Sequence, residues 1–325
     1  AWNDPTYLFS GPDALDPFDR SATLGFRCAL YPTPPPDAAF EPIERVFRDY
    51  ADETPVDDAV FDAYRRLHSY DRGPLEARVD STDNSDERWR VENVSYNAAY
   101  GGERIPARLL LPRDVEPPYQ VVLYFPSSAP LSLRSSAGRF RESANYGFLV
   151  RSGRAVLAPV FKEMYERRSP PGPRGESFWR DTRIKWSQDV GRSLDYLEER
   201  ADVDASRIAF QGLSLGANFG PVVTAVNPRF RAVVLVAGGL ATAPLPPEID
   251  RFHFAPHVHA PVLLINGRHD FLAPLETHQK PLLQLLPVPE DQKRLYVFDG
   301  GHVPPRWQEV VRETLDWLDH HMGPV

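Results

Sequence analysis

One stretch of the sequence has the residues that a serine nucleophile needs. Gly212, Ser214 and Gly216 form a Gly-x-Ser-x-Gly pattern after the apolar run 208–210, and a run with helical character follows from Ala217. This pattern between a strand and a helix is typical of a nucleophile elbow, a sharp turn that presents a serine hydroxyl at the edge of a sheet. We therefore predict that Ser214 is a nucleophile. A glycine-rich structural turn is the alternative, because the pattern also occurs by chance.

A serine hydroxyl attacks a carbonyl carbon only when a base accepts its proton and an acid orients that base. Asp270 follows the apolar run 262–265, and His302 follows the run 294–298. Each therefore comes after a predicted strand, as Ser214 does. We predict a triad in which His302 accepts the serine proton and Asp270 orients the imidazole.

Other residues nearby compete for these two roles. Asp270 is also a residue type that turns favour, and Asp299 or His269 would then be the functional neighbour. Asp299 is so close to His302 along the chain that it cannot easily support the imidazole from behind. His302 as a purely structural loop histidine is the remaining alternative.

The oxyanion formed by such an attack needs two N–H donors. The first is expected from Leu215, the residue after the nucleophile, and the second from the loop after the apolar run 121–125. That loop begins Pro126-Ser127-Ser128, and proline has no N–H group. The second donor is therefore Ser127 or Ser128, and the sequence leaves the choice open.

Three irregular stretches follow predicted strands, at 126–142, 161–182 and 237–260. They are expected at the carboxyl edge of the sheet, where α/β folds bind ligands. The second stretch is aromatic, basic and rich in proline, so we predict a substrate pocket lined by Tyr165, Phe178 or Trp179. A surface excursion without substrate contact is the alternative.

Three more histidines, His253, His257 and His259, form a group of their own. Their spacing supports no metal site strongly, so we interpret them as loop and helix-terminus residues. We expect the chemistry to need no metal and no organic cofactor.

The composition excludes several classes of function. The chain has 325 residues, a net charge of −8 and one cysteine, Cys28. It contains no basic patch that suggests nucleic acid, no apolar run of membrane-spanning length and no signal-peptide pattern at its start. One cysteine permits no intramolecular disulfide and no cysteine-based zinc site. We expect a cytoplasmic protein that acts on a small-molecule ester, without a nucleic-acid or membrane partner.

The expected elements alternate between strand and helix. An antiparallel hairpin is predicted at 90–96 and 104–111, with its second strand at a sheet edge because it contains Pro106. Further strands are expected at 121–125, 155–159, 208–211, 232–236, 262–265 and 294–298, and helices at 146–151, 184–200, from 217, and 307–320. This order predicts an α/β fold with a mostly parallel sheet, an antiparallel N-terminal hairpin and helices on both faces.

Before the hairpin we predict two short helices within 41–70. The apolar face of the first helix would consist of Ile43, Val46, Phe47 and Tyr50. The apolar face of the second helix would consist of Val56, Val60, Tyr64 and Leu67. Thr54 is the predicted N-cap of the second helix, with Pro55 at its first position. Residues 71–86 are polar and are expected to form a connection. We therefore divide the chain into an arm (1–40), a helical extension (41–86) and a catalytic domain (87–325).

Several stretches carry a resemblance to a known family. From about Thr54 onward, the chain resembles α/β-hydrolases of the dienelactone hydrolase and acetyl xylan esterase type, especially hydrolase domains at the C-termini of bacterial multidomain proteins. The stretches that carry it are 165–168, 191–197, 212–216, 236–240, 266–270 and 299–302. The resemblance implies a serine esterase with Ser214, Asp270 and His302 as its triad. Dienelactone hydrolases themselves use a cysteine nucleophile, so their substrate does not carry over.

The N-terminal arm carries a second resemblance. Residues 20–29, which include Gly25-Phe-Arg-Cys-Ala29, resemble the end of formylglycine-generating (sulfatase-modifying) domains. The matching cysteine of that motif is not catalytic, so Cys28 is given no chemical role. The chain would then be the C-terminal piece of a longer fusion; an arm packed on the hydrolase surface is the alternative. A homodimer formed through this arm is a further expectation.

These observations favour a serine carboxylesterase that hydrolyses short-chain acyl esters through an acyl-enzyme. A serine peptidase of the prolyl-oligopeptidase type uses the same triad and is the first alternative. A non-catalytic regulatory or binding module that retains the fold is the second.

Overall fold

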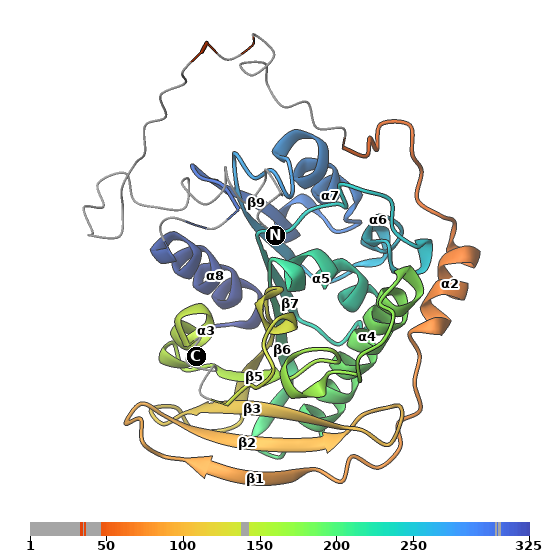
Figure 1. Ribbon diagram of the computed structural model, residues 1–325. Helices are drawn as coiled ribbons and strands as arrows, with labels where there is room; N and C mark the ends of the chain where they lie inside the picture. The colour runs from red at the N-terminus through yellow and green to blue at the C-terminus, as the bar shows by residue number, and fades with distance from the viewer. Residues whose placement is uncertain (1–32, 35, 37–46, 138–142, 303, 305–306) are drawn as a thin grey trace.

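The computed structural model describes residues 33–34, 36, 47–137, 143–302, 304 and 307–325. These residues form a nine-stranded sheet in the order β1-β2-β3-β5-β4-β6-β7-β8-β9 (Figure 1). The strands are β1 (Arg78–Asp83), β2 (Trp89–Asn97), β3 (Arg104–Pro112), β4 (Tyr119–Phe125), β5 (Ala155–Pro159), β6 (Val203–Leu213), β7 (Ala232–Val236), β8 (Val262–Gly267) and β9 (Lys293–Phe298). The resemblance to formylglycine-generating domains and Cys28 lie outside the described residues.

The sheet is antiparallel at its N-terminal end and parallel elsewhere. Strands β1, β2, β3 and β5 pair antiparallel, whereas β5, β4, β6, β7, β8 and β9 pair parallel. Every residue of β4 is buried, as expected for a strand covered on both faces. This arrangement confirms the prediction of a mostly parallel sheet that an antiparallel hairpin opens.

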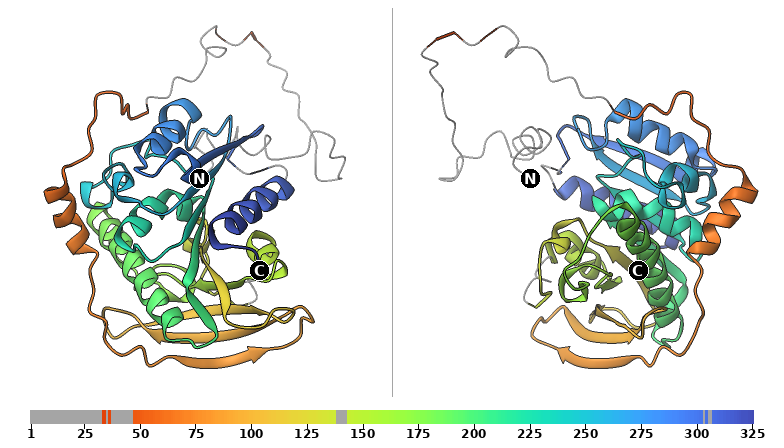
Figure 2. Two further views of the ribbon diagram at one scale, coloured as in Figure 1. Left: turned by 180° about the vertical axis from the view of Figure 1, so that it is seen from behind. Right: turned by 45° about the vertical axis from the view of Figure 1, so that its right-hand side comes forward.

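Helices cover both faces of the sheet, as Figures 1 and 2 show. On one face lie α3 (Ser143–Arg151) and α8 (Trp307–Met322); on the other lie α4 (Glu176–Glu198), α5 (Leu215–Val226), α6 (Arg251–Phe254) and α7 (Lys280–Leu285). Helix α2 (Asp58–Leu67) packs outside this second layer, and η6 (Leu275–Gln279) is a π-helical turn before α7. Each face buries its own hydrophobic cluster.

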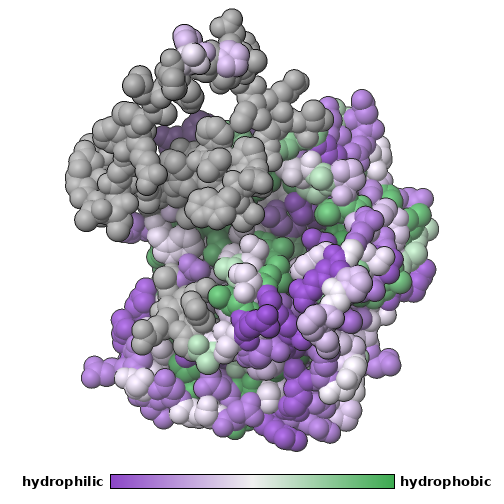
Figure 3. All heavy atoms as spheres, in the orientation of Figure 1, coloured by the Kyte–Doolittle hydropathy of each residue, from purple (hydrophilic) through white to green (hydrophobic). Residues whose placement is uncertain are grey.

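The surface mixes residue types over the face drawn in Figure 3. Hydrophobic side chains reach the surface near the middle of this face, between regions that are more hydrophilic. Among the described residues, no helix is long and apolar enough to cross a membrane.

The N-terminal extension differs in part from its prediction. Residues 47–57 form no helix, and α2 begins at Asp58 with Asp57 as its N-cap, not at Pro55 with Thr54 as the cap. The Asp57 carboxylate accepts the N–H of Val60, and Val60 and Leu67 are both exposed. Phe61 faces the core instead, and its ring stacks on His257.

Two predictions about the antiparallel region are wrong. The polar stretch 71–86 contains the edge strand β1, whose residues are all exposed, so it has no apolar alternation to reveal it. Strand β3 is internal despite Pro106, since it pairs with both β2 and β5. Pro106 is tolerated because it lies just before the residues that pair with β5, and its carbonyl oxygen accepts the N–H of Val160 at 2.8 Å.

A buried ionic network joins the hairpin turn to the second layer of helices. Asp189 of α4 is fully buried and accepts hydrogen bonds from Arg167 at 2.6 Å and from the Tyr100 hydroxyl at 2.8 Å. The backbone N–H of Lys162 donates to the same carboxylate at 3.0 Å. The network therefore fixes α4 relative to the segment that follows β5.

Replacing Asp189 tests how strongly this network holds the fold. Asp189→Asn should lower the free energy of unfolding by about 3–5 kcal/mol, because it removes the buried counter-charge of Arg167 and leaves only the longer pair with Glu103 at 3.4 Å. Urea denaturation measures the change. The matched control is Asp181→Asn on the same helix, where an exposed pair with Arg180 should contribute about 0–1 kcal/mol. Equal effects for the two variants would contradict this assignment.

Candidate active site

The turn between β6 and α5 holds Ser214 in a conformation that few residues adopt. Its backbone has φ 52° and ψ −102°, outside the usual regions for a side chain with a Cβ atom. The chain can turn this sharply because glycines stand two residues before and two residues after Ser214. A Cβ on Gly212 would collide with the backbone of Gly216, and a Cβ on Gly216 with the carbonyl oxygen of Phe125. Gly212, Ser214 and Gly216 thus form the strand–turn–helix elbow that the sequence predicts.

Hydrogen bonds to neighbouring strands fix this turn. The N–H of Ser214 donates to Val236 at the end of β7 at 2.8 Å. The N–H of Gly216 donates to the carbonyl oxygen of Pro126, just after β4, at 3.1 Å. The strained backbone is therefore held from both adjacent strands, which is how a structure keeps such a conformation in place.

The three predicted triad residues lie in one hydrogen-bonded chain. The Oγ of Ser214 is 2.8 Å from Nε2 of His302, and Nδ1 of His302 is 2.8 Å from Oδ2 of Asp270. Ser214 lies after β6, Asp270 after β8 and His302 after β9. The order Ser–His–Asp in space is the arrangement that lets an imidazole accept a serine proton.

The Asp270 carboxylate is buried and is oriented by its own turn. Its Oδ1 accepts the N–H groups of Leu272 at 2.8 Å and Ala273 at 3.3 Å, which leaves Oδ2 for His302. The Gln279 amide, which donates to the carbonyl oxygens of Gly267 and Ala273, braces both sides of this turn. Asp270 therefore has one defined direction in which to accept a hydrogen bond from Nδ1–H of the imidazole.

The backbone before His302 packs directly on the end of β8, the strand that precedes Asp270. A Cβ on Gly267 would collide with the carbonyl oxygen of Gly301, and the N–H of His269 donates to Gly300 at 3.0 Å. The competing carboxylate, Asp299, is exposed and lies 3.4 Å from the ring of His269. The structure thus brings Asp270 to His302 and directs Asp299 to His269.

The predicted oxyanion donors lie at the ends of β4 and β6. Leu215 is the first residue of α5, so its N–H has no partner within the helix. In the described part of the chain, the N–H groups of Leu215, Ser127 and Ser128 have no hydrogen-bond partner. Ser127 is half-buried beside Pro126, whereas Ser128 is exposed and begins the short 3₁₀ turn Ala129–Leu131.

Two asparagines, the buried Asn266 and the half-buried Asn218, support the site, and the sequence did not reveal them as functional. The Asn266 amide exchanges hydrogen bonds with both backbone groups of Gly238, and the Asn218 oxygen accepts the N–H of Gly239 at 3.2 Å. Together they hold the loop after β7 against the elbow. The signal that could have identified Asn266 is the pair Asn266-Gly267, which directly follows the predicted buried strand 262–265.

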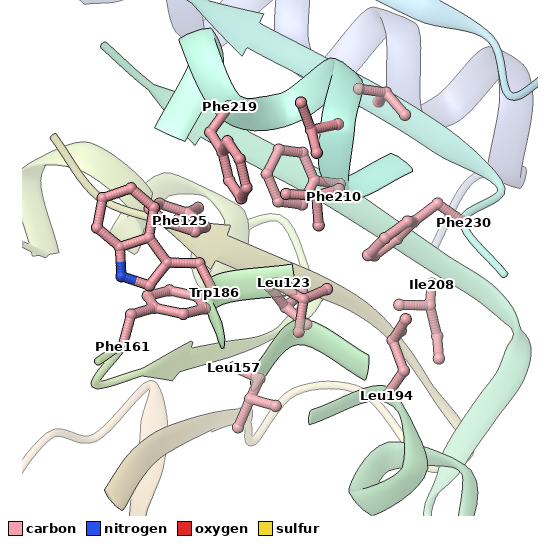
Figure 4. Packing of buried hydrophobic residues seen from close by; sticks show 14 of the residues in the cluster. Leu123, Phe125, Leu157, Phe161, Trp186, Leu194, Ile208, Phe210, Phe219 and Phe230 are labelled. Carbon is pink, nitrogen blue, oxygen red and sulfur yellow. The ribbon is translucent and has the colours of Figure 1, made fainter. Parts of the chain in front are cut away.

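A cavity of about 450 Å³ opens beside the elbow. Residues from all three irregular stretches line it, among them Leu131, Trp179 and Pro244, together with Leu215 of the elbow helix. Trp186 forms part of its wall and packs edge-on against Phe125 and Phe219, as Figure 4 shows. The cavity therefore lies where the sequence places the ligand site.

Only one of the three predicted pocket residues lines this cavity. Tyr165 is buried in the core instead, with a left-handed backbone. Phe178 packs edge-on against Trp179, with Arg174 over its ring, and does not line the cavity. For Phe178 the correction arises because α4 begins at Glu176, not at Ile184, so that 176–182 is a regular helix with only one side turned to the cavity.

The histidine group packs against the N-terminal extension. His253 Nδ1 accepts the N–H of Val56 at 3.3 Å, and His257 stacks on Phe61. Among the described residues there is no cluster of three or more His, Cys, Asp or Glu side chains that could hold a metal ion.

The sheet order, the elbow and the three loops after β6, β8 and β9 define the class of fold: the chain has an α/β-hydrolase fold. No model of a known protein family matches the sequence. The fold is similar to that of acetyl xylan esterase 1 from Thermoanaerobacterium sp., with a TM-score of 0.63 and 16% identity over 84% of this chain and 95% of that one. A putative dienelactone hydrolase from Klebsiella pneumoniae has a TM-score of 0.54 and 17% identity, covering 70% and 98%.

A sequence relative accompanies these structures. The chain is 26% identical over 184 residues to a bis(hydroxyethyl) terephthalate hydrolase of Streptomyces coelicolor. The match covers 51% of this chain and 56% of that protein, so it spans about half the length of each.

Replacing Gly267 tests whether the close approach of the two loops positions His302. Gly267→Ala should displace Gly301 and slow the reaction of Ser214 with a fluorophosphonate about 100-fold, because a shift of about 1 Å has such an effect on a reactive pair. The matched control is Gly172→Ala, whose new Cβ has no atom within 4 Å. Circular dichroism verifies folding. A folded Gly267→Ala protein that reacts at the native rate would contradict the assignment.

Proposed function

We propose that this protein is a serine carboxylesterase that hydrolyses short-chain acyl esters through an acyl-enzyme. The observation that carries the proposal is the unbroken hydrogen-bond chain from Ser214 through His302 to the buried Asp270. The similarity to a bis(hydroxyethyl) terephthalate hydrolase and to an acetyl xylan esterase supports a carboxylic ester as the substrate class.

The proposed reaction begins with His302 in the tautomer that donates Nδ1–H to Asp270. Nε2 then accepts the Ser214 proton as Oγ attacks the ester carbonyl carbon. The resulting imidazolium gives that proton to the departing alcohol oxygen when the tetrahedral intermediate collapses. Water, deprotonated by the same Nε2, attacks the acyl-enzyme and releases the acid, so that Ser214 regains its proton.

We assign the second oxyanion donor to Ser127. Ser127 is half-buried and follows Pro126, whose carbonyl oxygen accepts a hydrogen bond from the N–H of Gly216 in the elbow helix. With the N–H of Leu215 it would stabilise the negative charge that develops on the carbonyl oxygen. Ser128 is exposed at the start of a 3₁₀ turn and is the less suitable donor.

The preference for short acyl chains rests on the size and lining of the cavity. Its volume of about 450 Å³ is at the small end of ligand pockets, and prolines and tryptophans that adapt little line much of it. Acetyl and propionyl esters are therefore expected to react better than long-chain esters.

The first test is hydrolysis of 4-nitrophenyl acetate and its longer acyl homologues. Ser214→Ala should abolish turnover, and Asp270→Asn should lower kcat about 10⁴-fold because the imidazole then adopts the wrong tautomer. Ser206→Ala, a surface serine on β6, is the control and should match the native protein. Absence of ester turnover together with cleavage of peptides would favour the peptidase, and absence of both the binding module.

A second test separates the two serine donors by removing one N–H at a time. Ser127→Pro should lower kcat by about 10²–10³, the loss typical of one missing oxyanion donor. Ser128→Pro is the matched variant; its φ of −72° already suits proline, so a smaller effect is expected. Thermal melting verifies that both variants fold. The reverse order of activities would assign the donor to Ser128.

A further inference from the structure

One charged residue in the cavity has no counter-charge. Arg183 lies on the inner side of α4, is partly buried and lines the cavity together with Leu215, the residue after Ser214. In the described part of the chain, its guanidinium has neither a hydrogen bond nor an ion pair, and burial lowers its pKa. An unpaired, partly desolvated cation is costly to the folded state.

The charged residues around Arg183 do not neutralise its guanidinium. Arg180, one turn earlier on α4, pairs with Asp181 at 2.8 Å and with Glu248 at 3.5 Å. Glu176 also lines the cavity, but it is exposed in the first turn of the helix.

A second arginine, Arg251, adds to the positive charge near Arg183. Arg251, at the start of α6, has a buried Nε without a hydrogen-bond partner. Burial lowers its pKa to about 10, and repulsion from Arg183 contributes to that shift. The carboxylate beside it, Asp250, is already engaged by Arg48.

We propose that Arg183 binds a carboxylate that the ester substrate carries in addition to its scissile ester group. This inference rests on the proposed esterase function and narrows its substrate class to acidic esters. Trp179 and Trp186 would contact the apolar part of such a substrate, since their rings line the same cavity.

The chemistry of the cavity favours this ligand. A guanidinium presents paired N–H groups that match the two oxygens of a carboxylate, and such charge-assisted pairs are stronger than neutral hydrogen bonds. Arg183 lines the cavity from α4, and Leu215, the residue after Ser214, lines it from the elbow helix. A neutral ester would leave the cation unpaired, which gives the site a basis for selectivity.

Matched ester pairs test the proposal on either side of the scissile bond. On the acyl side, 4-nitrophenyl hemiglutarate is compared with 4-nitrophenyl valerate; on the alcohol side, 4-acetoxybenzoate is compared with phenyl acetate. Arg183→Met should lower kcat/KM for the acidic member of one pair about 10–100-fold more than for its neutral partner. Arg183→Lys should give a smaller loss, because lysine keeps the charge but not the paired donors. Arg180→Met is the control and should leave both ratios at the native value.

Binding of the product gives a second readout. Glutarate or 4-hydroxybenzoate should inhibit hydrolysis of the neutral ester competitively, and Arg183→Met should weaken that inhibition by a similar factor. If the ratio of acidic to neutral ester is unchanged in a folded Arg183→Met protein, the inference fails while the esterase function stands. If the native protein hydrolyses none of the four esters, the esterase function fails and the inference with it.

Discussion

The site depends on one backbone constraint, the left-handed turn at Ser214. Such a conformation costs on the order of 1–3 kcal/mol, and it persists only where the surroundings fix it. Here the N–H of Ser214 is bonded to β7 and the N–H of Gly216 to the residue after β4. The same turn that directs the hydroxyl outward leaves the N–H of Leu215 without a helical partner. Nucleophile and oxyanion donor therefore arise from a single local geometry.

The parallel sheet converts this turn into a complete site. Three parallel strands, β6, β8 and β9, end at the same edge and deliver Ser214, Asp270 and His302 there. Contacts between the loops then set the fine positions: Gly267 allows the His302 loop to approach, and Asn266 holds the loop after β7. The cavity with Arg183 and the two tryptophans lies on the α4 side of the elbow, so reactivity and selectivity come from different elements.

Much of the fold could be predicted from the sequence because its buried strands are short apolar runs. The elbow, Asp270 and His302 were identifiable since each follows such a run, and the structure brings their side chains together. The edge strand β1 was missed because all of its residues are exposed. Phe178 was misplaced because the start of α4 was not recognised, and Tyr165 because an aromatic residue in an irregular stretch can be buried in the core as well as exposed to a ligand. Arg183 was missed for a different reason: an unpaired arginine is recognisable only when its neighbours in space are known.

The central claim is that Ser214 forms a covalent acyl intermediate, and one measurement tests it directly. The native protein is mixed with 4-nitrophenyl acetate, quenched in acid during turnover, digested and analysed by mass spectrometry. The account predicts that the peptide containing Ser214 gains the mass of one acetyl group, and that it loses this mass once the substrate is exhausted. Hydrolysis without acetylation of Ser214, or acetylation confined to another residue, would contradict the account.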